Sequence, residues 1–199
     1  MMGASYYISF TDDYSCETKV QFLKHKSEAL TAFKQYEANL TRQHPGAKLR
    51  KLQSDRGGEY LSAEFNQYLK DQGIQQQLTV HHSPQQNGVV ERLNRTLVEH
   101  ARAMLLARDM LKFLWAEAIN YATWLKNRLL SQAIPRYTPY ELINKLKPNL
   151  AQAHEFGAKV YVHLQDMGKL EAKAEEAVFV GVDDQSKGYR IYWAGRPGK

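Results

Sequence analysis

The chain has 199 residues, of which 43% are hydrophobic and 24% charged, a composition typical of one folded domain, or one domain with a small module, rather than a disordered chain. The net charge of +6 suits a polyanionic partner. Cys16 is the single cysteine, so an internal disulfide and a Cys–His zinc site are both excluded. No run of 18 apolar residues and no signal-peptide pattern occur, so we expect an intracellular protein without a membrane span.

The N-terminal part predicts two strands followed by a helix. Residues 6–11 and 18–23 are rich in aromatic and β-branched side chains, and the polar segment 12–15 between them predicts a turn. Apolar residues then recur at helical spacing, which predicts a helix capped by Ser27 and ending near Gln43.

A strand, a helix and a strand follow. Residues 48–53 are placed as a strand by context, since their charges break a clean alternation. Residues 62–72 carry apolar side chains at helical spacing, Gly73 caps that helix, and residues 74–80 predict a short strand. Next to the first of these strands, Gly57 and Gly58 are expected to let the backbone turn sharply.

Residues 81–87 are polar and predict a mobile, turn-rich segment before the longest helix, which we expect from Gly88 to about Leu111. One apolar stripe of this helix comprises Val90, Leu93, Leu97, Ala101, Met104 and Leu105. A second line along its surface holds Glu91, Arg95, Val98 and Arg102. This line suits phosphate held near a metal, but it is also compatible with a surface helix that carries a Glu91–Arg95 ion pair.

The remaining chain predicts two helices and then strands. Residues 113–130 form a helix with an apolar face, and Thr138 begins a short helix that ends near Asn144. Three strands are expected at residues 159–164, 177–182 and 189–193.

Two acids stand out, Asp55 and Glu91, with 35 residues between them. One follows a predicted strand and the other lies in the first turn of a helix. Hard cations such as Mg²⁺ prefer oxygen ligands, and two such ions about 3.5–4 Å apart can hold both oxygens of a displacement at phosphorus. The pair therefore indicates a metal site whose ligands come from two separate segments of the chain. Such a site normally contains a third carboxylate.

These acids lie in Ser54-Asp55-Arg56-Gly57-Gly58-Glu59-Tyr60 and in the segment 83–96, which resemble the second and third acids of the D,D-35-E integrase cores of copia-type (Ty1-like) retrotransposons. Other segments resemble that family in the same order along nearly the whole chain: Thr11-Asp12-Asp13-Tyr14-Ser15, residues 22–28, Trp115-Ala116-Glu117-Ala118, Thr138-Pro139-Tyr140-Glu141-Leu142, Phe156-Gly157 and Tyr161-Val162-His163. The ordered set is far more specific than two acids at one spacing.

The resemblance implies an α/β fold with an RNase H-like catalytic core over residues 1–147, a linker over 148–155 and an SH3-like β module over 156–199. It also implies three strands before the first helix, whereas the sequence predicts two. We therefore expect the first strand and its catalytic aspartate to lie upstream of Met1, and the SH3-like module to be incomplete at Lys199.

The resemblance further implies a role for each site residue. Asp55 and Glu91 would be catalytic and would bind Mg²⁺ or Mn²⁺ in a two-metal site. The expected nucleic-acid contacts are Arg95 and Arg102 to phosphates, and Gln86 and Asn87 to the DNA end or the shape of the loop. DNA and further copies of the chain are the implied partners, in the nucleus.

Four other residues keep alternative interpretations. Asp12 is a possible third ligand or a turn residue that bonds its own backbone. Glu59 matches the family motif and is interpreted as a surface or substrate-contact residue rather than a ligand. His81 and His82 are either DNA contacts or a surface pair.

The implied activity is metal-dependent polynucleotidyl transfer, in which DNA ends are trimmed and then joined to target DNA. One alternative is a non-catalytic, nucleic-acid-binding remnant of a retroelement polyprotein. Another is an RNase H-like nuclease that cuts without joining.

Overall fold

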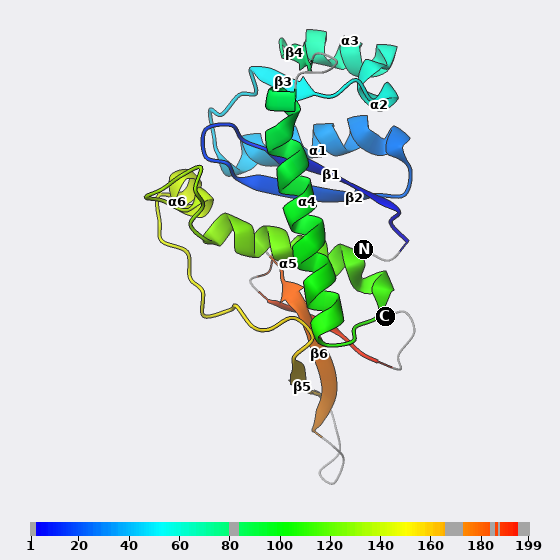
Figure 1. Ribbon diagram of the computed structural model, residues 1–199, viewed down its shortest axis with the longest axis vertical. Coiled ribbons are helices and arrows are strands. Elements are labelled where there is room, and N and C mark those ends of the chain that lie inside the picture. Colours follow the sequence, from blue (N-terminus) through cyan, green and yellow to red (C-terminus); the bar gives the residue numbers. More distant parts are fainter. Residues whose placement is uncertain (1–2, 80–83, 166–172, 184–185, 187, 195–199) are drawn as a thin grey trace. The chain divides into compact units, whose positions relative to one another are not determined.

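A computed structural model describes residues 3–79, 84–165, 173–183, 186 and 188–194 (Figure 1). Packing divides them into two compact units: unit 1 holds residues 3–11 and 19–95, and unit 2 holds residues 12–18 and 96–194. No helix of the described part is long and apolar enough to cross a membrane.

Unit 1 contains two pairs of strands and several helices. Strand β1 (Tyr6–Thr11) pairs with β2 (Thr18–Leu23), and β3 (Lys51–Ser54) pairs in parallel with β4 (Gln75–Leu78). The helical elements are the 3₁₀ turn η1 (Lys26–Glu28), α1 (Ala29–Gln43), α2 (Gly58–Leu61), α3 (Ala63–Asp71) and the start of α4 (Pro84–Ala107).

Helix α1 supplies the centre of the core of unit 1. Phe33 of α1 lies with its ring centroid 6.0 Å from that of Phe10 on β1 and 5.5 Å from that of Phe65 on α3. Leu52 of β3 packs against the same cluster. Both strand pairs therefore share one apolar core, built around a single helix.

Helix α4 contacts β1 on the other face of that strand. Ile8 and Phe10 point into the core, and Ser9, between them, donates its hydroxyl to Asn94 Oδ1 of α4 at 3.0 Å. Because successive strand residues point to opposite faces, α1 and the first half of α4 cover opposite faces of β1.

Unit 2 is organised around α5 (Trp115–Arg128), which follows the 3₁₀ turn η2 (Lys112–Leu114). This helix is buried on most of its faces, including polar Thr123 and Asn127. The Asn127 side chain accepts a hydrogen bond from Thr18 N–H at 2.9 Å and donates one to the Thr18 carbonyl at 2.7 Å, so it pairs with the backbone as a neighbouring strand would.

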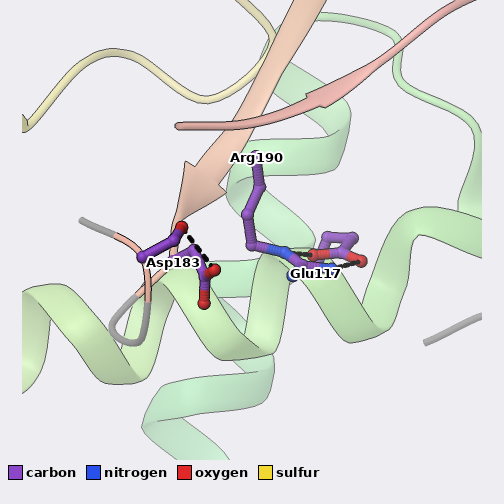
Figure 2. Close-up of polar contacts among 4 residues, drawn as sticks. Glu117, Asp183 and Arg190 are labelled. Carbon is purple, nitrogen blue, oxygen red and sulfur yellow. Dashed lines mark hydrogen bonds and ion pairs between the residues drawn. The ribbon is translucent and has the colours of Figure 1, made fainter. Parts of the chain in front are cut away.

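The C-terminal strands form an antiparallel sheet in the order β5 (Lys159–His163), β6 (Ala174–Val182) and β7 (Tyr189–Tyr192). The sheet packs on α5, where the Tyr121 ring meets the Phe179 ring edge-on at 5.3 Å. Figure 2 shows a second link, in which Arg190 of β7 binds both carboxylate oxygens of Glu117 at 2.7 Å. The predicted domain boundary at residues 148–155 stays a prediction, but the sheet and α5 belong to one packing unit.

Two short helical elements match the sequence prediction closely. Helix α6 (Pro139–Asn144) begins with a full capping box, in which Thr138 Oγ1 accepts from Glu141 N–H at 3.2 Å and Glu141 accepts from Thr138 N–H at 2.8 Å. The second interaction lowers the pKa of Glu141, because hydrogen bonds from Thr138 stabilise its charged form. Helix α3 is likewise capped by Ser62, which accepts from Phe65 N–H.

Several predicted boundaries are wrong. The N-cap of α1 is Glu28 and not Ser27, because a 3₁₀ turn precedes the helix. Strand β3 spans Lys51–Ser54 instead of residues 48–53. Strand β6 begins at Ala174 instead of residue 177, since its pairing with β5 carries it through Glu175 and Glu176, which give no hydrophobic signal.

The longest helix also differs from its prediction. It begins at Pro84, so residues 84–87 are helical rather than part of a mobile segment, while residues 80–83 lie outside the described part. It ends at Ala107, because Asp109 takes the left-handed φ of 47° and Met110 N–H bonds back to the Leu105 carbonyl. Val90, expected on the buried stripe, is 45% exposed.

Candidate metal and nucleic-acid site

Asp55 lies directly after the carboxyl end of β3 and is exposed. The preceding Ser54 carbonyl accepts a hydrogen bond from Thr79 N–H at 3.0 Å, which fixes the end of the strand against the segment after β4. Asp55 Oδ1 accepts from Gly57 N–H at 2.9 Å, so the carboxylate is held over the loop that follows it. The sequence prediction of an acid presented by a strand end is therefore confirmed in its geometry.

Gly57 has a different role from the predicted sharp turn. Its φ of −55° and ψ of 140° are open to any residue. A larger residue at this position is disfavoured by lack of space, because a Cβ atom at Gly57 would lie 2.9 Å from Glu59 Oε2 and 3.0 Å from Asp55 Oδ1. Two carboxylates thus approach the same α-carbon, whereas a Cβ atom at Gly58 would meet nothing within 4 Å.

The pKa of Tyr60 is affected by these two acids. Its ring packs edge-on against Phe65 at 5.6 Å between centroids. Burial raises the pKa of the Tyr60 phenol to about 12, and the negative charges of Asp55 and Glu59 contribute in the same direction. Sequence reasoning did not single out Tyr60 and assigned Glu59 to a surface or substrate contact. The signal available for Glu59 was its position four residues after Asp55, inside a motif with two glycines.

Glu91, Arg95, Val98 and Arg102 are all exposed on α4, as expected for one solvent-facing line. Glu91 and Arg95 form no ion pair with each other among the described residues, so the ion pair of the surface-helix alternative is not supported. The exposure of the four side chains fits both interpretations. Gln86 and Asn87 lie in the first turns of α4, and the structure does not describe their side chains.

Asp12 is a turn residue. Its Oδ2 atom accepts hydrogen bonds from Ser15 N–H at 2.7 Å and from Ser15 Oγ at 2.6 Å. The suggestion that Asp12 supplies a third metal ligand is therefore not supported. Across the described residues, no group of three or more His, Cys, Asp or Glu side chains could hold a metal ion. His81 and His82 lie outside the described residues.

Two protein families match the chain. The integrase core domain family matches residues 2–84, which include Asp55, and the retroviral polymerase SH3-like domain family matches residues 158–196. These matches confirm the two parts that the sequence resemblance implied, in the same order along the chain.

Relatives of the chain are found among plant retrotransposon polyproteins. The chain is 36% identical over 194 residues to the retrovirus-related Pol polyprotein from transposon TNT 1-94 of Nicotiana tabacum, and 29% identical over 178 residues to that from transposon RE2 of Arabidopsis thaliana. These alignments cover 96% and 88% of the chain, but only 14% and 12% of the relatives. The predicted relationship to copia-type elements is confirmed.

Solved integrase structures resemble the structure of this chain. The HTLV-2 integrase catalytic core domain in complex with magnesium is 26% identical, with a TM-score of 0.50, over 67% of this chain and 80% of that one. An intasome of simian T-cell lymphotropic virus, solved with a PP2A regulatory subunit, is 18% identical, with a TM-score of 0.57, over 96% of this chain and 73% of that one. The RNase H-like fold class of the core is thereby confirmed.

Proposed function

We propose that this chain acts in DNA integration, as the part of a retrotransposon Pol polyprotein that carries out metal-dependent polynucleotidyl transfer. The reaction comprises trimming of the DNA 3′ ends and their joining to target DNA. The observation that carries the proposal is the match of residues 2–84 to the integrase core domain, with Asp55 at the carboxyl end of β3 inside the matched segment. The likeness to a core solved with magnesium supports it.

Asp55 and Glu91 are the proposed ligands of Mg²⁺ or Mn²⁺ in a two-metal site. Their chemistry fits a hard cation, because both are exposed carboxylates. Carboxylate oxygens of Asp55 and Glu59 also lie close to the position that a Cβ atom of Gly57 would take. When bound, the metal would activate the attacking oxygen and stabilise charge on the phosphate. The chain's own contribution is to hold Asp55 through Gly57 N–H at the end of a paired strand.

DNA is the proposed substrate and partner. Arg95 and Arg102 on the exposed line of α4 would meet phosphates, and Gln86 and Asn87 in its first turns would contact the DNA end. The net charge of +6 favours such binding. We further propose that the chain works as a homo-oligomer in the nucleus, in keeping with its likeness to an intasome subunit.

A non-catalytic, nucleic-acid-binding remnant is the second candidate. Among the described residues the structure gathers fewer than three potential metal ligands in any one place, and Asp12 is occupied in a turn. Such a protein would bind DNA in a salt-sensitive manner and yield no metal-dependent product. An RNase H-like nuclease is a third candidate, and it would cut DNA without joining it.

A joining assay separates the three candidates. The purified chain is incubated with a labelled duplex oligonucleotide and a supercoiled plasmid in Mg²⁺ or Mn²⁺, and the label covalently joined to the plasmid is measured. Joined product that is lost in Asp55→Asn and in Glu91→Gln, but retained in Glu99→Gln, a neutralised exposed acid on the same helix, would support the proposal. Cleavage without joining would identify a nuclease, and DNA binding without any product would identify a remnant.

A further inference from the structure

Glu59 is brought to Asp55 by the fold, although sequence reasoning gave it no part in the metal site. The distances of Glu59 Oε2 and Asp55 Oδ1 from the Cβ position of Gly57 limit the separation of these two oxygens to about 6 Å. Adjacent ligands of an octahedral Mg²⁺ are roughly 3 Å apart, given metal–oxygen distances of about 2.1 Å. To share one ion, the two oxygens would therefore approach each other by at most about 3 Å, which is the scale of side-chain movement.

The backbone that carries Glu59 is held on both sides. Tyr60 N–H bonds the Gly57 carbonyl at 3.0 Å, and the Tyr60 carbonyl accepts from Gln76 Nε2 of β4 at 2.9 Å. The Tyr60 ring is in turn packed on Phe65, which is fully buried. Glu59 itself is half-buried. Its carboxylate thus projects from a fixed turn beside the strand that carries Asp55.

No cation of the described part of the chain pairs with the carboxylate of Asp55 or of Glu59. A divalent cation would supply positive charge at this place. The adjacent cationic residue, Arg56, donates its Nε–H to the Thr79 carbonyl at 3.3 Å. None of the ion pairs formed within the described residues includes Asp55 or Glu59.

We propose that Glu59 is a further carboxylate ligand of the divalent cation held by Asp55, and that Gly57 is required because it leaves the two carboxylates free to converge. The inference rests on the proposed metal-dependent function and adds a ligand and a steric requirement to it. It applies to Mg²⁺ and to Mn²⁺, since both take carboxylate oxygens.

Binding of Mn²⁺ alone to the full chain tests the proposal without any catalytic readout. Titration calorimetry, or the electron paramagnetic resonance signal of free Mn²⁺, gives the affinity. We expect Glu59→Gln, an isosteric change, to weaken Mn²⁺ binding by about tenfold or more, the scale on which supporting groups of metal sites act. Glu59→Asp keeps the charge and is expected to retain part of the affinity.

Two glycine variants provide a matched steric test. Gly57→Ala places a methyl group between the carboxylates and is expected to weaken Mn²⁺ binding by a similar factor, without a backbone conformational cost at its φ of −55°. Gly58→Ala adds the same methyl group one residue later, into open space, and is expected to bind as the parent chain does. Circular dichroism confirms that each variant remains folded.

The Mn²⁺ affinities of these variants separate the possible outcomes. Loss of affinity in Asp55→Asn with none in Glu59→Gln would overturn the role of Glu59 and leave the proposed function standing on Asp55 and Glu91. Equal effects of Gly57→Ala and Gly58→Ala would overturn the steric requirement. Absence of Mn²⁺ binding by the parent chain would overturn both the inference and the metal-dependent function.

Discussion

At the scale of single residues, Tyr60 reports on the candidate site without being a ligand. Its ring packs against Phe65, and the negative charges of Asp55 and Glu59 contribute to its raised pKa. Tyr68, on α3, has a pKa that is also raised to about 12, but chiefly because its hydroxyl donates to Glu37 at 2.7 Å. Both tyrosines therefore have a raised pKa, but only that of Tyr60 depends on the acids of the candidate site.

We predict that Asp55→Asn and Glu59→Gln each lower the pKa of Tyr60, which stays above 10.0 because burial is its largest cause. A raised pKa means that the folded state holds the phenolic proton more tightly. Its contribution to stability is therefore present below pH 10 and lost as pH rises toward about 12. Titration of ring carbon signals by NMR measures this, with Tyr68 as the internal control. Equal shifts of both tyrosines would contradict the prediction.

At the scale of elements, two arginine–glutamate pairs with two-point contacts hold the C-terminal part of unit 2 together. Glu117 of α5 pairs with Arg190 of β7, and their side chains are 13% and 31% exposed (Figure 2). Glu155 pairs with Arg108, and both of these side chains are about half exposed. Hydrogen bonding to Glu117 raises the pKa of Arg190, so this guanidinium stays charged. The first pair is the stronger because water screens it less.

We predict that Glu117→Gln lowers the free energy of unfolding by about 1–3 kcal/mol, because it leaves the Arg190 charge partly desolvated without a counter-charge. Glu155→Gln, the same change in the exposed pair, is expected to cost at most about 1 kcal/mol. Urea denaturation followed by circular dichroism measures both. Costs of equal size would show that the lower exposure of the Glu117–Arg190 pair adds nothing to its contribution to stability.

At the scale of the whole molecule, the net charge of +6 is the property that would govern the proposed association with DNA. Each phosphate neutralised by a protein cation releases counterions, which makes affinity fall steeply with salt. Arg95 and Arg102 are exposed on α4, whereas Arg42 is exposed at the end of α1. Only the first two belong to the line proposed to meet DNA.

We predict that Arg95→Gln and Arg102→Gln each weaken duplex DNA binding and each reduce the slope of log affinity against log salt by about one. Arg42→Gln removes the same charge from another element and is expected to leave the slope unchanged. Fluorescence anisotropy with a labelled duplex at several salt concentrations supplies the slopes. Three equal reductions would mean that net charge alone, and not the line on α4, is responsible.

The sequence by itself determined the order of the elements and the choice of Asp55 as a candidate metal ligand. Local periodicity, capping residues and motif spacing are properties of neighbouring residues and can be recognised without the fold. Strand β1 and helix α6 illustrate this, since each follows from a short pattern. Only the tertiary structure decided that Val90 is exposed and that the C-terminal sheet packs on α5. These features depend on which surfaces meet when the chain closes on itself, and packing between distant segments leaves no signature in the local pattern.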